Sequence, residues 1–71
     1  MVKQRFEITG MHCTGCVMAV EGAVEDLAGV LSARADYARQ FADVEYDETR
    51  VTPDQIIAAI AESGYQARLA S

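Results

Sequence analysis

Two cysteines, Cys13 and Cys16, are separated by two residues and are the only cysteines among the 71 residues of the chain. A disulfide between them would close a very short loop and constrain the unfolded chain little. A disulfide scaffold needs more bridges, spread further along the chain. A pair of small buried apolar side chains is the plain alternative, but glycine, threonine and histidine around the cysteines make a poor core. We therefore predict that the pair serves metal binding or thiol chemistry.

The two cysteines lie where a predicted strand gives way to a predicted helix. We place Cys13 in the connecting loop and Cys16 in the first turn of the helix, so that both sulfur atoms point to one spot outside the fold. The unpaired N–H groups and the positive dipole end of that helix favour thiolate, the form that binds metal. Two soft sulfur ligands suit an ion that accepts few ligands, such as Cu(I). Closed zinc sites need four ligands, and iron–sulfur clusters usually need four cysteines, which this chain cannot supply alone.

The elements that must position this loop are predicted from hydrophobic periodicity. Apolar residues alternate with period two in the strands and recur at steps of three and four in the helices. The second helix has a strong start, because Thr52 can cap it, Pro53 suits its first position and Gln55 completes a capping box. In chain order we predict a strand over 2–9, a helix that carries Cys16 in its first turn and ends near Gly29, strands over 30–36 and 40–47, a helix over 53–63 ended by Gly64, and a strand over 65–69.

This β-α-β-β-α-β order predicts an α+β, ferredoxin-like fold, in which two helices cover one face of a four-stranded antiparallel sheet. Phe41 is expected to face outward, and Gln4 is the one polar residue in the apolar pattern on the inner face of the first strand. The apolar residues predicted to line the inner face are Val2, Phe6, Ile8, Val17, Val20, Val24, Leu27, Ala42, Val44, Tyr46, Ile56, Ile57, Ile60, Ala61, Tyr65, Ala67 and Leu69.

Composition narrows the class of protein. The chain is 51% apolar and 24% charged, which is ordinary for a globular domain, and we expect residues 1–71 to form one domain. Six Lys and Arg against eleven Asp and Glu give a net charge of −5, which argues against nucleic acid and anionic membranes as partners. No apolar run approaches the roughly 18 residues of a membrane span, and the amino terminus does not resemble a signal peptide. A cytoplasmic, soluble protein is expected, unless the chain was cut from a longer one.

Residues 10–16, which read Gly-Met-His-Cys-Thr-Gly-Cys, resemble the Gly-Met-x-Cys-x-x-Cys signature of the heavy-metal-associated domain family. The resemblance runs over nearly the whole chain. It implies a ferredoxin-like fold, Cu(I) held by Cys13 and Cys16, and transfer of the ion by ligand exchange to a homologous domain, such as that of a copper-transporting P-type ATPase. The signature is specific for the family and less specific for the metal, so Hg(II) and Zn(II) stay open.

The resemblance also assigns roles around the cysteines. Met11 matches the family's methionine, which packs beneath the loop rather than binding the metal. Tyr65 matches a residue just after the second helix that shields the site. His12 stands where the family often has threonine. It could serve as a third ligand or bridge two molecules that share an ion, but a solvated side chain is the favoured interpretation.

We expect a non-enzymatic copper chaperone, because no group typical of a catalytic site is present. The first helix carries Glu21, Glu25 and Asp26 and no basic residue, so a neutral or basic docking face is expected on the partner. The apo protein is expected to be a monomer, and a shared ion could bridge two copies into a dimer. The alternatives are an excised amino-terminal domain of a copper P-type ATPase or mercuric reductase, and a small dithiol oxidoreductase.

Overall fold

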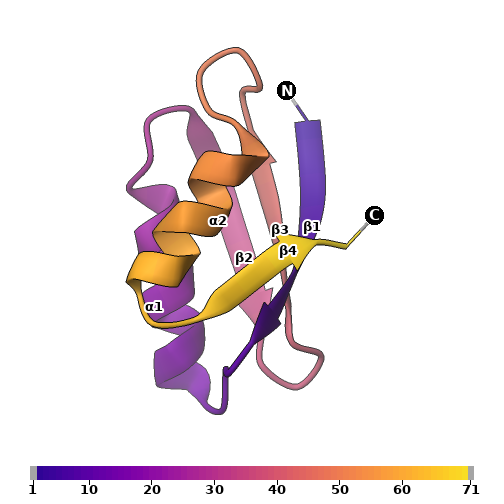
Figure 1. Ribbon diagram of the computed structural model, residues 1–71, viewed down its shortest axis with the longest axis vertical. Helices are drawn as coiled ribbons and strands as arrows, with labels where there is room; N and C mark the ends of the chain where they lie inside the picture. The colour runs from indigo at the N-terminus through magenta and orange to yellow at the C-terminus, as the bar shows by residue number, and fades with distance from the viewer. Residues whose placement is uncertain (1, 71) are drawn as a thin grey trace.

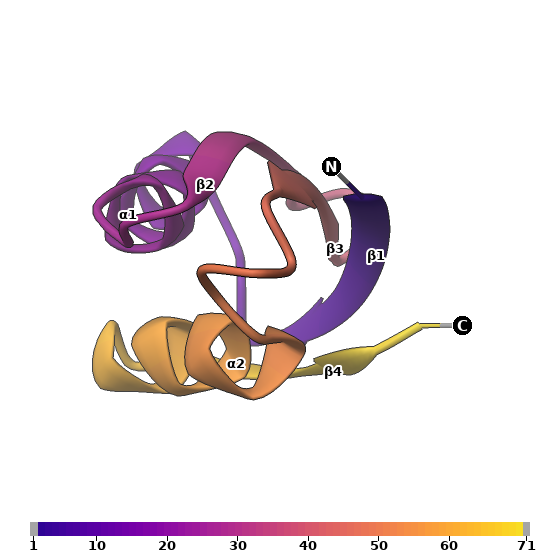
Figure 2. The same ribbon diagram turned by 90° about the horizontal axis from the view of Figure 1, so that it is seen from above.

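The computed structural model describes residues 2–70, and Met1 and Ser71, the two ends of the expected 1–71 domain, lie outside the described residues. The predicted β-α-β-β-α-β order is confirmed, and the two helices lie on the same side of the sheet (Figure 1, Figure 2). The elements are β1 (Val2–Thr9), α1 (Thr14–Glu25), β2 (Val30–Asp36), β3 (Phe41–Tyr46), α2 (Pro53–Glu62) and β4 (Gln66–Leu69). None of the helices within residues 2–70 is long and apolar enough to cross a membrane.

The sheet is antiparallel with the strand order β2-β3-β1-β4. The central strands are therefore β3 and β1, and the edge strands of the sheet are β2 and β4. Along β1, Phe6 lies opposite Ala42 of β3 and Leu69 of β4. At the end of β1, Thr9 pairs with Gln66, the first residue of β4. This register brings the segment after β1 next to the segment before β4, two parts of the chain that are far apart in sequence.

The core lies between the inner face of the sheet and the two helices. Both central strands contribute alternate residues to it, as period two requires, and each helix contributes residues four positions apart. The predicted capping box of α2 is present, with Thr52 Oγ1 accepting from the N–H of Gln55 at 3.2 Å. The buried apolar residues are Phe6, Ile8, Met11, Val20, Val24, Ala33, Ala42, Val44, Tyr46, Val51, Ile56 and Ile60.

Two predicted core residues are exposed instead. Ala61 lies one position past Ile60, which turns its side chain about 100° around the helix and out of the interface. Leu69 is 42% exposed, because it ends a four-residue strand at the edge of the sheet. Tyr65 lies before β4 rather than in it, and its side chain still packs against the core.

The helix α1 ends at Glu25, earlier than the predicted end near Gly29. Gly29 instead forms the turn into β2, with φ +99, and a Cβ there would lie 2.8 Å from Cβ of Arg50. A glycine is required at this position by the backbone conformation and by the close approach. The outward position of Phe41 also has a physical reason, since the Arg5 guanidinium lies 4.0 Å from the centre of its ring.

Candidate metal centre

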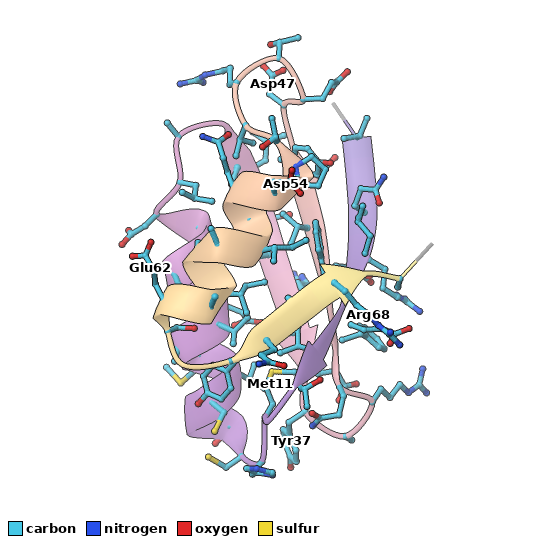
Figure 3. All side chains as sticks on the ribbon, viewed as in Figure 1. Met11, Tyr37, Asp47, Asp54, Glu62 and Arg68 are labelled. Carbon is cyan, nitrogen blue, oxygen red and sulfur yellow. The ribbon has the colours of Figure 1, made fainter. Side chains whose placement is uncertain are left out.

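Residues 10–13 form the loop that carries Cys13, here named the thiol loop, and they join β1 to α1 just before Cys16. The loop lies at one end of the molecule, the end where Met11 and Tyr37 are labelled in Figure 3. Gly10 reverses the chain after β1 with φ +102, a conformation that residues with a side chain rarely adopt. A Cβ at Gly10 would lie 3.4 Å from Cδ1 of Tyr65, so the tyrosine ring packs closely over this part of the loop.

The two sulfur atoms lie side by side, with Cys13 Sγ 3.4 Å from Cys16 Sγ, and both cysteines are free thiols. Cys13 is the N-cap residue of α1 with an extended backbone, and its carbonyl oxygen accepts from the N–H of Val17 at 3.2 Å. Its side chain makes no capping hydrogen bond, so the helix does not engage this sulfur. Cys13 is exposed and Cys16 is half-buried in the first turn of α1.

Hydrogen bonds lower the pKa of the Cys16 thiol to about 7. The largest contribution is a hydrogen bond from the Tyr65 side chain, followed by a backbone hydrogen bond from His12 and then the Cys13 side chain. The pKa of Tyr65 is raised in turn, because its hydroxyl proton is held by the Cys16 sulfur. The thiolate of Cys16, the form that binds metal, is therefore more accessible near neutral pH than that of an ordinary cysteine. Reasoning from the sequence expected the helix end to favour thiolate and did not foresee that the Tyr65 side chain also lowers the pKa of Cys16.

The other predicted site residues take different positions around this thiol pair. Met11 is 1% exposed and its side chain belongs to the core. Tyr65 is half-buried against the core, and His12 is exposed. Within residues 2–70, no group of three or more His, Cys, Asp and Glu side chains is placed to hold a metal ion, so His12 does not complete a three-ligand cluster with the cysteines.

Two of the acidic side chains of α1 are engaged within the fold. Glu21 Oε2 accepts a hydrogen bond from the N–H of Ala35 at 2.8 Å, and Glu25 Oε2 accepts one from the N–H of Ala33 at 3.4 Å. Both donors belong to the edge strand β2. These carboxylates are therefore less available for docking than the sequence suggested.

Reasoning from the sequence missed one residue at this end of the molecule. Gln40, in the turn between β2 and β3, donates hydrogen bonds from Nε2 to the carbonyl oxygens of Met11 and Tyr37. The turn residues after β2 gave a general signal for a hairpin, but no local pattern indicates a contact with the thiol loop.

The family model of the heavy-metal-associated domain matches residues 5–66 of this chain. The chain is 38% identical over 68 residues to the copper chaperone CopZ of Enterococcus hirae, a match that covers 96% of this chain and 99% of that protein. It is 40% identical over 63 residues to the cation-transporting ATPase HMA5 of Oryza sativa subsp. japonica, which covers 89% of this chain and only 6% of the ATPase.

Solved structures agree with these matches. A copper-binding domain from HMA7, a P-type ATPase, superimposes with a TM-score of 0.98 at 31% sequence identity, covering 100% of this chain and 96% of that one. The same architecture is thus found in a protein about as long as this chain and in a small part of much longer ones.

Proposed function

The chain belongs to the heavy-metal-associated domain family, and on that premise we propose that it carries Cu(I) on Cys13 and Cys16 and passes the ion to a homologous metal-binding domain. The observation that carries this proposal is the pair of free sulfur atoms 3.4 Å apart at an exposed end of the molecule. The similarity of this chain to the copper chaperone CopZ and to a copper-binding ATPase domain supports copper as the ion that is carried.

The geometry suits an ion that takes few ligands. Metal–thiolate bonds are about 2.3 Å long for zinc, so sulfur atoms 3.4 Å apart can reach a single ion of similar size. A more open S–metal–S angle needs only a modest separation of the two sulfurs. Two soft thiolates without a third ligand from residues 2–70 favour Cu(I) over Zn(II), which prefers four ligands. Hg(II) is the competing soft ion.

Transfer to a partner follows from this open coordination. A thiolate of the partner binds the exposed ion first, giving a three-sulfur intermediate, and then one thiolate of this chain leaves. A second exchange of the same kind completes the transfer, so each new metal–sulfur bond replaces one that breaks. Cys13 is more exposed than Cys16, and we therefore expect the partner to approach from the Cys13 side.

The surrounding residues support the thiol pair rather than bind the ion. Met11 anchors the loop through its buried side chain, and Tyr65 shields the site and favours the thiolate of Cys16. His12 is a solvated neighbour. Metal binding on two thiolates needs reduced cysteines, which persist in reducing compartments, and a cytoplasmic location is therefore part of the proposal. A copper-transporting P-type ATPase is the proposed partner.

Mixing the Cu(I)-loaded protein with an apo metal-binding domain of a copper-transporting ATPase tests the proposal. After separation of the two proteins, copper is expected on both, in a ratio set by their relative affinities. The Cys13→Ser/Cys16→Ser variant should deliver none. Copper that stays entirely on this chain at equilibrium, with an excess of partner domain, would contradict a carrier role. Turnover of a disulfide substrate by the apo protein would instead favour a dithiol oxidoreductase.

A further inference from the structure

Gln40 lies outside the thiol loop but contacts it directly. Its side-chain Nε2 donates hydrogen bonds to the carbonyl oxygens of Met11 and Tyr37. Its own backbone carbonyl accepts from the N–H of Ile8 at 2.9 Å. One residue thus connects three segments: the end of β1, the turn between β2 and β3, and the loop that leads to the cysteines.

Glutamine is an unusual residue for the backbone conformation found at position 40. Its φ is +58, and within residues 2–70 it is the one residue other than glycine with a positive φ. Glycine adopts this region freely and asparagine does so more readily than most residues, whereas other side chains are disfavoured there. Glycine has no side chain to offer, and the amide of asparagine is one methylene shorter. A long amide side chain at such a position indicates that its reach to Met11 has a use.

The contact fixes the part of the loop that the helix does not. Cys16 lies within the first turn of α1, whereas Cys13 is tied to the helix only through its carbonyl oxygen, which accepts from the N–H of Val17, and its exposed side chain has no capping contact. Met11, two residues before Cys13, is held at both ends, by its side chain in the core and by its carbonyl oxygen at Gln40. The position of the Cys13 sulfur relative to Cys16 therefore depends on how firmly Met11 is held, as well as on this single contact with the helix.

We propose that Gln40 is a positioning residue for the metal site, which keeps Cys13 close enough to Cys16 for both thiolates to reach one ion. This inference rests on the proposed function. Without the donor, the loop samples conformations in which the two sulfurs are apart, and Cu(I) must restore the pairing when it binds. Removal of residues that orient metal ligands commonly lowers metal affinity by about ten- to a hundredfold.

Two variants separate the side-chain contact from the backbone requirement. Gln40→Met keeps the length of the side chain and removes the donor, whereas Gln40→Asn keeps the amide and suits the backbone but is too short to reach Met11. Gln66→Met, at an exposed glutamine of β4, is the matched control. We expect both Gln40 variants to bind Cu(I) about tenfold more weakly and the control to bind as the wild type does. In the apo protein, the amide proton of Val17, which donates to the carbonyl oxygen of Cys13, should exchange with deuterium faster in both Gln40 variants.

The Gln40→Asn variant guards against a merely structural effect, because its backbone suits the position and its urea midpoint should not fall. Wild-type Cu(I) affinity in Gln40→Asn would overturn the proposal. So would a weaker affinity with unchanged exchange at the amide of Val17. Failure of the wild type to bind Cu(I) would overturn the proposed function instead, and the exchange rates of the apo protein would still decide whether Gln40 holds the loop.

Discussion

The Tyr65 side chain packs over Gly10 at the start of the loop that leads to the cysteines, and it makes the largest of the contributions that lower the pKa of the Cys16 thiol to about 7. The tyrosine reaches the cysteine because β4 pairs with β1, which places the segment before β4 over Gly10. The sheet register and the chemistry of the thiol are therefore connected through one aromatic side chain.

Replacement of Tyr65 by phenylalanine tests this connection. Without the hydroxyl donor, the thiolate of Cys16 is less stabilised, so the pKa should rise from about 7 toward the ordinary value of 9.0. The rate of alkylation of Cys16 by iodoacetamide, followed by mass spectrometry across pH 5–10, should then rise at a higher pH than in the wild type, because the thiolate is the nucleophile. The control is Tyr37→Phe, at an exposed tyrosine of the neighbouring turn. An unchanged midpoint in Tyr65→Phe would contradict the assignment.

Substitutions at Met11 distinguish a packing role of its side chain from metal binding by its sulfur. Its side chain is buried in the core, so Met11→Ala should lower the free energy of unfolding by about 2–4 kcal/mol through the cavity it leaves. Met11→Leu nearly conserves the volume and should cost less than about 1.5 kcal/mol. The leucine variant lacks the thioether, and its Cu(I) affinity should nevertheless equal that of the wild type. A large loss of Cu(I) affinity in a stably folded Met11→Leu protein would identify the sulfur as a ligand.

Glu21 and Glu25 protect an edge of the sheet. Their carboxylates accept the outward N–H groups of Ala35 and Ala33 in β2, groups that an exposed edge would offer to another strand. Glu21→Ala should lower the free energy of unfolding by about 1 kcal/mol and speed hydrogen exchange at Ala35. The matched control is Glu62→Ala, at an exposed glutamate of α2. Equal exchange at Ala35 in the two variants would show that the contact does not form in solution.

Replacing each of two glycines by alanine should change the free energy of unfolding in opposite directions. Gly29 has φ +99, and an added Cβ would lie 2.8 Å from Cβ of Arg50, so Gly29→Ala should lower the free energy of unfolding by about 1–3 kcal/mol. Gly22 lies within α1, and apart from the nearby helix backbone and its chain neighbours no atom lies within 4 Å of the position of its Cβ. Gly22→Ala should therefore raise the free energy of unfolding by about 0.5–1 kcal/mol. Urea unfolding of both variants measures the difference, and stabilisation by Gly29→Ala would refute the packing of that turn.

The element order and most of the core could be predicted from the sequence, because they depend on periodicity and capping that are local in the chain. Val44 and Ile56 lie inside as their patterns indicate. The exposure of Leu69 was not predicted, because the short length of the edge strand is a property of the sheet.

The thiol pair could be predicted from the spacing of the two cysteines alone, whereas the residues that contact the thiol loop could not. The contact of Gln40 with Met11 joins residues that are distant in the chain, and no local pattern records it. The role of Tyr65 at Cys16 was expected only from the family resemblance, and its effect on the thiol pKa required the folded geometry.

A competition titration of the reduced protein with Cu(I) against a strong chromogenic chelator, run in parallel with Zn(II), tests the central claim most directly. We predict tight one-to-one binding of Cu(I) that disappears when Cys13 and Cys16 are alkylated, with Zn(II) bound far more weakly. Cu(I) binding that is weak, or that survives alkylation of both thiols, would contradict the account. In that case a titration with Hg(II) and a disulfide-exchange assay would decide what the thiol pair does.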